Sequence, residues 1–416
     1  MTCRFLENLT LGSLVAPVPD EEFEACYWEQ KPLVVHRECP DYYDGLFTLQ
    51  DFDDAITRNP SYIKMANATS KKNASYKTEK VQGLEAALAD MRDGGTLVLD
   101  QLHSHDPKLG LLCRLLAQEL GHAFQTNLYL TPPQGKGFTP HWDNHDVFIL
   151  QVLGSKHWQI EKGRRAFPAL GDKMGEEGRE FHGDVTSFVL NQGDLIYIPR
   201  GYVHAAECGS EPSMHITLGV TAIFWHDLLS AIIKATVLRD QRLRCALPLR
   251  FMNDTGKGLV NDAMAALREA NDEAFVGAVV DQYRDELVKK FPLDVSGQVE
   301  SFFQPVPLTA GDLIGPRRGI VYRMHAGDDS VRLNFGDRSI VFPSFFREAL
   351  DFALNTRDFA IRDLPGELED EERIVFIERL LQEGLVFRKK NLRTECAPLI
   401  IKRVEAADSQ NSLVND

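Results

Sequence analysis

Short apolar runs, alternating or continuous, dominate the middle of the chain from about residue 125 to residue 221. Turns that carry Gly or Pro separate these runs, and each run has the length and pattern of a β-strand. They cover residues 127–131, 146–152, 157–160, 186–190, 194–198 and 213–218. Many short strands at this spacing are typical of a barrel or a sandwich, so we predict such a core here.

Helical patterns precede these strands. Residues 21–30 gather apolar side chains on one side, and Pro32 ends that element. Further elements follow in order: a strand at 33–35, a helix from Thr48, a strand at 95–99, and a helix at 109–120 that Gly121 ends. We therefore predict helical decoration on the N-terminal side of the β core.

Two more blocks follow the strands. Residues from about 225 to 291 have helical apolar spacing, in 227–237 and 258–290. From about 305 to 403, strands at 319–323, 330–334 and 339–342 precede helices at 343–354 and 370–383 and a last strand at 384–387. Helix, helix and then a strand after Gly is the order of a winged-helix unit. We predict domains at 1–222, 223–300 and 301–405, with a polar, disordered tail at 406–416.

Composition narrows the class of protein. The 416 residues are 44% hydrophobic, which is enough for ordinary buried cores. The formal net charge of -15 argues against a large non-specific nucleic-acid surface, because such surfaces need clustered Lys and Arg. We expect no direct DNA binding, and an acidic chain suits a basic protein or peptide substrate.

The cysteines and the N-terminus indicate a compartment. The seven cysteines are widely spaced and form no C-x-x-C pair, so they predict neither a disulfide framework nor a zinc ribbon. Residues 1–17 lack the apolar stretch of a signal peptide, and no run approaches the ~20 apolar residues of a membrane helix. We expect a cytoplasmic protein without a membrane anchor.

Two short strings carry residues suited to metal binding. The string GFTPHWD (137–143) contains His141 and Asp143, which point to the same side if the chain is extended. The string GDLIYIPRGYVH (193–204) ends on His204 after a turn, a strand and a second turn. Two His and one carboxylate form a face that leaves positions on Fe(II) open. A lone His-x-Asp is weak, since surface His and Asp are common, so the prediction rests on both strings.

The same region resembles a known family, the JmjC ribosomal oxygenases, which include bacterial arginine hydroxylases and human nucleolar histidine hydroxylases of ribosomal proteins. The resemblance rests on NLYLTPPQGKGFTPHWD (127–143), VFILQVLGSKHW (147–158) and 193–204, with FEACYWEQKPL (23–33) as a further match. It covers about residues 20–220. It implies a double-stranded β-helix, the jelly-roll of JmjC and cupin domains, and a helical block that forms a homodimer.

The resemblance also implies a chemistry and its residues. His141, Asp143 and His204 would bind Fe(II), and Lys156 would bind the C5 carboxylate of the cosubstrate 2-oxoglutarate. Asn127 and Tyr129 match polar positions of the pocket. His215 is expected beside the cosubstrate site or in the core rather than on the metal. With O2, such a centre would hydroxylate an Arg or His side chain of a protein, which in this family is a ribosomal protein, and release succinate and CO2.

Other roles remain open for two of these residues, and other functions remain open for the chain. Taken alone, Lys156 is a surface turn residue and Tyr129 a core hydrogen-bonding residue. Trp142 and Asn144 differ from the Tyr and Asp of the human relatives, which leaves the substrate open. The same chemistry could act on a precursor peptide, a small molecule or an N-methyl-lysine. A non-catalytic cupin-like protein with a DNA-binding winged helix is a further candidate, although the acidic segment 367–383 makes a poor recognition helix.

Overall fold

The computed structural model describes residues 3–58, 63–66, 79–80, 84–162, 167–169, 171–172, 180–247, 249–250, 252, 257–303 and 307–389. The chain divides into two compact units. The first comprises Met1–Val295 and Arg317–Arg347, and the second Ser296–Pro316 and Glu348–Asp416. The predicted domain boundaries stay predictions, and the predicted tail 406–416 lies outside the described residues.

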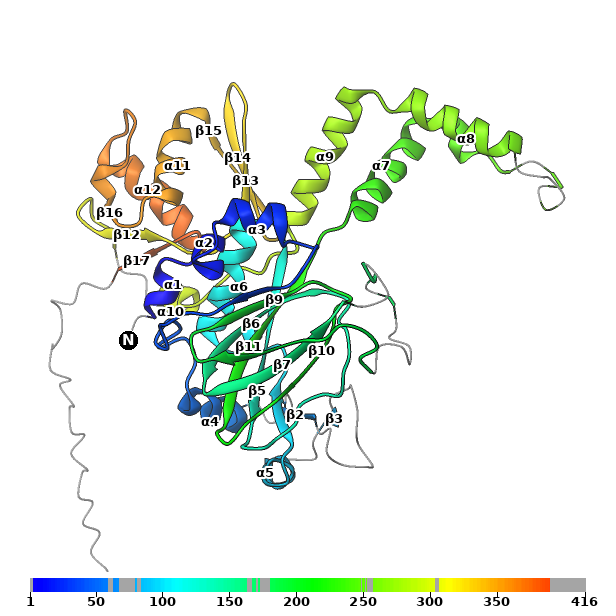
Figure 1. The fold of residues 1–416 in the computed structure, drawn as a ribbon. Helices are drawn as coiled ribbons and strands as arrows, with labels where there is room; N and C mark the ends of the chain where they lie inside the picture. Colours follow the sequence, from blue (N-terminus) through cyan, green and yellow to red (C-terminus); the bar gives the residue numbers. More distant parts are fainter. Residues whose placement is uncertain are drawn as a thin grey trace, which may run out of the picture. The chain divides into compact units, whose positions relative to one another are not determined.

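Two antiparallel sheets form the body of the first unit (Figure 1). The larger sheet has the order β1-β9-β6-β11-β5-β4-β2-β3, and the smaller has the order β10-β7-β8. This is the strand-rich core expected from the sequence. The strands are β1 (Leu33–Val35), β2 (Ile63–Ala66), β3 (Glu79–Lys80), β4 (Thr96–Leu99), β5 (Ala123–Thr131), β6 (Asp146–Leu153), β7 (Ser155–Glu161), β8 (Thr186–Asn191), β9 (Leu195–Ile198), β10 (Val203–Glu207) and β11 (Ser213–Thr221).

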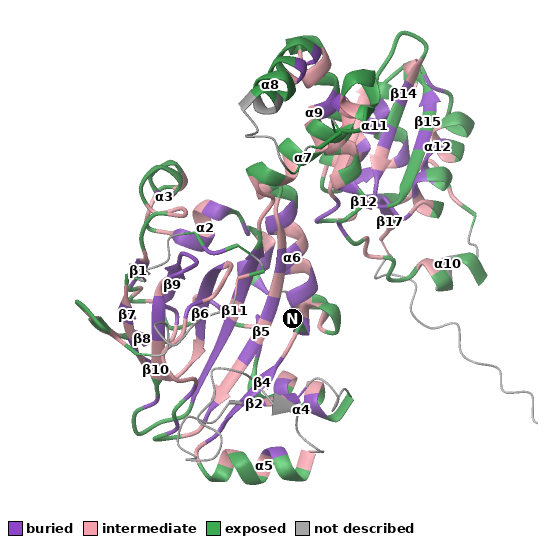
Figure 2. Ribbon diagram, turned by 90° about the vertical axis from the view of Figure 1, so that its right-hand side faces the viewer, coloured by how far each residue is buried: buried purple, intermediate pink, exposed green. Residues whose placement is uncertain are grey.

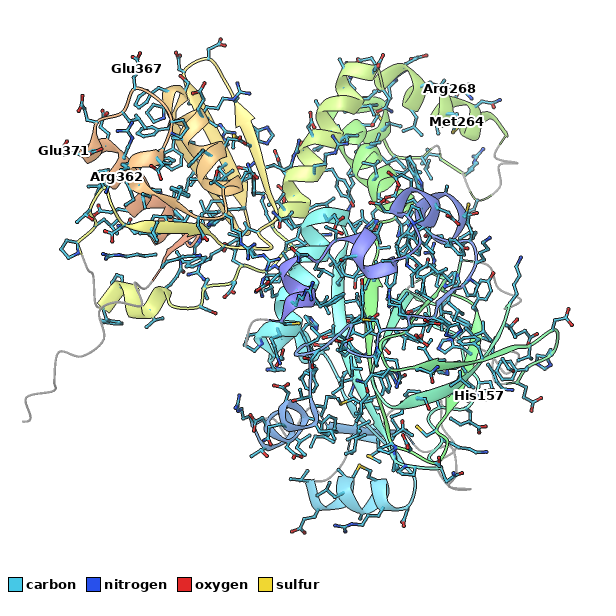
Figure 3. The ribbon with its side chains drawn as sticks, turned by 60° about the vertical axis from the view of Figure 1, so that its left-hand side comes forward. His157, Met264, Arg268, Arg362, Glu367 and Glu371 are labelled. Atoms are coloured by element: carbon cyan, nitrogen blue, oxygen red, sulfur yellow. The ribbon has the colours of Figure 1, made fainter. Side chains whose placement is uncertain are left out.

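Alternation along β7 decides which of its side chains enter the space between the sheets. Lys156, Trp158 and Ile160 are buried, while His157 lies on the opposite face of the strand and is more exposed (Figure 3). An apolar cluster drawn from β6, β7, β8 and β9 fills one part of this space; its members are Val147, Ile149, Trp158, Ile160, Leu190, Ile196 and Ile198. The charged Lys156 is therefore enclosed by the barrel rather than left at its surface.

The other face of the larger sheet is covered by helices. The helices of this region are α1 (Arg4–Glu7), α2 (Leu11–Val15), α3 (Asp20–Cys26), α4 (Leu49–Arg58), α5 (Leu84–Arg92) and α6 (Pro107–Leu120), with a 3-10 turn at Leu102–Ser104. Leu112 and Leu116 of α6 join Phe148 and Tyr197 of the sheet in one core. Figure 2 colours the central strands β9, β6 and β11 mostly as buried, which agrees with their largely apolar sequences, whereas buried and half-buried residues alternate along β5.

One predicted helix ends earlier than its pattern suggested. Residues 21–30 were expected to be helical, but α3 ends at Cys26. Glu29 has a φ of 56°, outside the helical range, and its backbone N–H donates to the Tyr197 hydroxyl at 2.8 Å. The hydrogen bond from Glu29 to Tyr197 of β9 replaces a helical hydrogen bond. The sequence around Glu29 gives no signal that predicts this contact.

A helical arm and a three-stranded sheet complete the first unit. The arm comprises α7 (Trp225–Arg239), a 3-10 turn (Gln241–Arg244), α8 (Lys257–Ala270) and α9 (Glu273–Val288), and α7 contacts both α8 and α9 (Figure 1). The predicted helical stretch 258–290 is divided where Asp272 caps α9 by accepting from the Phe275 N–H at 2.8 Å. The sheet comprises β13 (Tyr322–Ala326), β14 (Ser330–Phe335) and β15 (Arg338–Pro343), followed by a 3-10 turn at Ser344–Phe346.

The second unit contains a small sheet of order β16-β12-β17 with helices around it. Its elements are α10 (Gln298–Phe303), β12 (Leu313–Pro316), α11 (Arg347–Asn355), β16 (Phe359–Ala360), a 3-10 turn (Ile361–Asp363), α12 (Asp370–Gln382) and β17 (Val386–Arg388). The expected order of two helices and a strand after a glycine is present, with Gly384 at a φ of 75°. The identity of this unit as a winged helix stays a prediction.

Two observations bear on the sequence-level expectations of compartment. Over the ranges described above, no helix is long and apolar enough to cross a membrane. Cys3, Cys26, Cys39, Cys113, Cys208 and Cys245 are free thiols. Cys396 lies outside the described residues.

Candidate functional site

His141 and His204 face each other across an antiparallel bridge that adds His141 to the free side of β10. The His141 N–H donates to the His204 carbonyl at 3.1 Å, and the His204 N–H donates back at 2.8 Å. Residues paired in this way point to the same face, and the two ring centroids are 4.4 Å apart. Segments that lie 63 positions apart in the sequence are thus joined at the metal-binding motif.

The hydrogen bonds of the two rings fix their tautomers. His141 Nδ1 lies 3.0 Å from the Thr139 carbonyl, and His204 Nδ1 lies 3.0 Å from the Tyr202 carbonyl. A carbonyl only accepts, so both Nδ1 atoms carry the proton and both Nε2 atoms keep a free lone pair. This is the arrangement that orients a histidine as a metal ligand.

Asp143 completes a three-residue cluster. Its Oδ2 lies 3.6 Å from His204 Nε2, and its carbonyl accepts from the Gly201 N–H at 2.9 Å. One ligand atom from each of His141, Asp143 and His204 lies within 4.8 Å of the others. The donor set of two imidazoles and one carboxylate fits a first-row divalent metal with open positions.

Burial sets the protonation states of this cluster. Burial and, to a lesser extent, the neighbouring His141 lower the pKa of His204 to about 4, so the ring is neutral at pH 7. Burial alone would raise the pKa of Asp143, but His145, His141 and His204 outweigh it and the pKa is lowered. Neutral imidazoles and an ionised carboxylate are the forms that bind a metal.

The cluster opens onto a cavity of about 390 Å³. Its described lining residues come from both sheets of the barrel and from the segment that precedes β6: Thr96, Val98, Asp100, Asn127, Tyr129, Gly137, Phe138, His141, Asp143, Val147, Ile149, Lys156, Trp158, His204, Ala205, Ala206, His215 and Thr217. A volume of this size holds a small organic acid together with part of a substrate side chain.

Lys156 lies at the end of the cavity away from the cluster. His204 pairs with Ile160 in the β10–β7 register, and Lys156 is four residues further along β7, or about 13 Å of strand. The ammonium donates to the Thr131 hydroxyl at 2.9 Å, and this hydroxyl is hydrogen-bonded to Thr96 at 2.9 Å. Lys156 is therefore held by hydroxyl groups and aimed along the cavity.

No carboxylate pairs with Lys156 in the part of the chain that the structure describes. Its side chain is only 2% exposed, and burial lowers its pKa to about 8. A buried ammonium without a counter-charge is costly, and a ligand carboxylate would remove that cost. This end of the cavity fits an anionic group.

The other three predicted pocket residues line the same cavity. Tyr129 and His215 are partners in the β5–β11 register, and their rings stack at 4.8 Å with an interplanar angle of 6°. Burial lowers the pKa of His215 well below its usual value, and its buried Nδ1 has no hydrogen-bond partner. Asn127 accepts from the Gln101 N–H at 2.9 Å. His215 thus offers a neutral, unpaired nitrogen to the cavity.

Sequence reasoning missed two residues that line this cavity and a third that contacts Lys156. Thr131 anchors Lys156, Trp158 contributes a buried indole N–H without a partner, and Asp100 is a second carboxylate. Trp158 could have been found from its spacing of two from Lys156, which puts both on one strand face. His145, His157 and His182 are not part of the three-residue cluster.

Comparison with known proteins gives the family context. Residues 103–228 match the family described as the JmjC domain. A bifunctional lysine-specific demethylase and histidyl-hydroxylase NO66 of Aedes aegypti is 26% identical over 90% of this chain and 66% of its own length. Ribosomal oxygenase 1 of Gallus gallus is 33% identical over 62% of this chain and 45% of its own. The chain thus spans less than two thirds of the length of either relative.

Solved structures share the fold. The Escherichia coli protein ycfD covers 89% of this chain and 98% of its own, with a TM-score of 0.56 and 16% identity. The same ribosomal oxygenase in complex with cobalt and 2-oxoglutarate gives a TM-score of 0.52 at 15% identity. These likenesses, with the match over residues 103–228, confirm the predicted JmjC and cupin fold.

Proposed function

This chain is a JmjC-domain protein related to the ribosomal oxygenases, and from that premise we propose that it is an Fe(II)- and 2-oxoglutarate-dependent oxygenase. One observation carries the proposal. The cavity has a cluster of two imidazoles and a carboxylate near one end, and at the other a buried Lys156 that pairs with no carboxylate of the described residues. A metal chelate with a distal carboxylate satisfies both ends at once.

The chain's own residues hold and orient the reactants. His141, Asp143 and His204 would hold Fe(II), with the histidine orientations fixed by the Thr139 and Tyr202 carbonyls. Lys156 would pair with the C5 carboxylate of 2-oxoglutarate. When bound, the metal and cosubstrate supply the oxidation: O2 and 2-oxoglutarate are converted to succinate and CO2 while one oxygen atom enters a C–H bond of the substrate.

Aromatic and polar residues would shape the rest of the pocket. Tyr129 and His215 are packed against each other beside Trp158, whose ring centroid lies 5.6 Å from that of His215. These rings exclude water from the space between Lys156 and the metal cluster, which strengthens charge pairing there. Nδ1 of His215 and the indole N–H of Trp158 are buried and have no hydrogen-bond partner among the described residues.

We propose a protein substrate, a ribosomal protein hydroxylated at Arg or His. The names of the similar proteins support the ribosomal target, and the acidic chain suits a basic partner. A precursor peptide or a small molecule is the alternative target of the same chemistry. Demethylation of N-methyl-lysine ranks below hydroxylation, although one similar protein is named for both activities.

A non-catalytic cupin-like binding protein is the alternative from another class. Glu367 and Glu371 are exposed on the second unit (Figure 3), which disfavours binding to DNA phosphates there. We therefore propose that the chain acts without direct DNA contact. A cytoplasmic location is also proposed, because a reducing compartment keeps iron in the Fe(II) state.

The proposal is tested by cosubstrate binding. With Mn(II) in place of Fe(II), calorimetry should show one 2-oxoglutarate per chain. Binding should require the metal, because the cluster supplies one end of the chelate. Asp143→Ala should lose both ligands, while Lys156→Ala should keep Mn(II) and bind 2-oxoglutarate weakly. Metal-independent binding, or an unaltered Asp143→Ala protein, would reject the site.

A further inference from the structure

The cavity has a second carboxylate that the proposed metal site does not use. Thr96, Val98 and Asp100 of the β4 segment all line it, as expected for residues two apart on one strand face. Thr96 lies at the Lys156 end of the cavity, because its hydroxyl is hydrogen-bonded to the Thr131 hydroxyl that accepts from Lys156. Asp100 is four residues further along, about 13 Å by strand geometry. Thr96, Val98 and Asp100 therefore extend from the Lys156 end of the cavity to its opposite end.

Asp100 is close to the proposed reaction centre. Burial, and then the charge of Asp143 and that of Asp100, raise the pKa of the Tyr129 hydroxyl, so both carboxylates lie near that hydroxyl. Asn127 accepts from the backbone N–H of Gln101, which has a left-handed φ of 51°. This hydrogen bond anchors the turn that carries Asp100. The carboxylate is thus carried by an anchored turn and lines the same cavity as the metal cluster.

The charges of the described lining residues leave Asp100 to a substrate. Leaving the histidines aside, three lining residues carry a charge at pH 7: Asp100, Asp143 and Lys156. Asp143 belongs to the metal cluster and Lys156 to the cosubstrate. Only Asp100 remains, and its charge attracts a cation.

A lysine of the chain already occupies this carboxylate. Lys64 of β2 pairs in register with Val98, so its side chain lies on the cavity face of the sheet, and its ammonium forms an ion pair with Asp100. The two side chains are 25% and 27% exposed. An ion pair this accessible to water is weak and exchanges readily. Lys64 therefore shows that the position accepts a cation.

Resting on the proposed function, we propose that Asp100 determines substrate specificity by accepting the cationic end of an arginine or lysine side chain in place of Lys64. A guanidinium would pair with the carboxylate through two parallel hydrogen bonds. Its methylene groups would then extend toward the metal cluster. A neutral imidazole gains no such pairing, so a histidine is the disfavoured substrate.

The test uses the full-length protein with Fe(II), 2-oxoglutarate and air, and a pool of synthetic peptides tiled across ribosomal proteins. Mass spectrometry identifies the residue that gains oxygen or loses a methyl group. We expect an Arg or a Lys. Asp100→Asn should lower kcat/KM on that peptide by about 10- to 100-fold, the range for losing a charge-assisted hydrogen bond. Asp100→Glu should restore part of it.

Two further variants isolate the effect. Asp51→Asn removes the carboxylate of a comparable ion pair, Lys108–Asp51, outside the cavity, with side chains 31% and 30% exposed; its kcat/KM should match the wild type. Lys64→Met frees Asp100 and should lower KM for the same peptide. This second variant tests the idea even if Asp100→Asn folds poorly.

Modification of a histidine or another uncharged residue would overturn the inference, as would an Asp100→Asn protein with unaltered kcat/KM. Binding of 2-oxoglutarate to the Mn(II)-loaded wild type is measured beside it. If that binding is absent, the proposed oxygenase itself has failed. If it is present, a negative result counts against Asp100 alone.

Discussion

At the scale of single residues, the site depends on which groups carry a proton. The Nδ1 hydrogen bonds of His141 and His204 leave Nε2 free, and burial keeps His204 neutral. Asp143 then supplies the only anionic ligand of this cluster. The three side chains act as a unit, so the loss of one should disable the others.

Asp143→Ala should abolish turnover. Without the carboxylate the cluster retains two neutral ligands, and we expect metal affinity to fall by at least about 100-fold, since even supporting residues cost 10- to 100-fold. Succinate formation, measured at saturating 2-oxoglutarate, should be undetectable. His157→Ala, which removes an outward-facing histidine of β7, is the control and should behave as wild type. Intact turnover in Asp143→Ala would mean that the metal lies elsewhere.

Lys156 should make 2-oxoglutarate binding depend on pH. The pKa of the free amine is about 8, lowered by burial, and only the ammonium pairs with a carboxylate. As pH rises above 8 the fraction in the charged form falls, so affinity should drop about tenfold per pH unit until the pKa of the bound form is reached. Below pH 8, the affinity for 2-oxoglutarate should be nearly constant over the neutral range.

Calorimetry with the Mn(II)-loaded protein between pH 7 and pH 9 measures this dependence. Lys156→Ala should bind more weakly at pH 7, with a raised KM for 2-oxoglutarate, and should lose the decline above pH 8. A wild-type affinity that is constant up to pH 9 would show that Lys156 does not pair with the ligand.

At the scale of elements, a buried charge network joins the two segments that carry the ligands. Asp146, at the start of β6, accepts from the Tyr197 hydroxyl at 2.8 Å and from the Arg200 guanidinium at 2.8 Å. Arg200 also pairs with Glu29. Asp146 follows Asp143 by three positions, and Arg200 precedes His204 by four. The network therefore fixes the spacing of the ligand-bearing segments.

Arg200→Met should destabilise the fold by about 3 kcal/mol, because it leaves the fully buried Asp146 carboxylate without its cation. Denaturant unfolding followed by circular dichroism measures this change. Arg242→Met breaks the surface pairs of Arg242 with Asp240 and Glu269 and should leave the free energy of unfolding nearly unchanged. Equal effects of the two substitutions would contradict a special role for the buried network.

Local pattern and long-range contact explain which parts of the structure could be predicted. The strands of the core and the grouping of His141 with Asp143 follow from spacings of two along extended chain. The Lys64–Asp100 pair joins residues 36 positions apart, and the Lys156–Thr131 contact joins residues 25 apart. No local signal marks such contacts. The strand β10 was not predicted, and its formation depends on pairing with β7.

At the scale of the whole molecule, the helical arm is the predicted site of self-association. Several apolar side chains of α7, α8 and the segment between them are exposed, among them Met264 of α8, which Figure 3 labels beside Arg268. The others include Trp225, Leu229, Ile233, Leu238, Leu247, Leu249 and Met252. Exposed apolar surface of this extent marks interaction sites, and we propose that a second copy of the chain covers it.

Leu238→Asp combined with Met264→Asp should convert a dimer to a monomer. A charge placed in an apolar interface is desolvated without a partner and opposes association. Light scattering after gel filtration gives the mass in solution. Val341→Asp, which alters an exposed apolar residue of β15, is the matched control and should stay dimeric. A wild-type protein that is monomeric at all concentrations would reject the proposal.

The central claim is that this chain transfers oxygen from O2 to a protein. The most direct measurement is the intact mass of ribosomal proteins from a strain lacking the enzyme, incubated with the purified protein, Fe(II), 2-oxoglutarate and isotopically labelled O2. The account predicts that one ribosomal protein gains one labelled oxygen atom, with succinate formed in the same tube and neither product formed by Asp143→Ala. Labelled oxygen gained equally with Asp143→Ala, or no succinate from a wild-type protein loaded with both ligands, would contradict it.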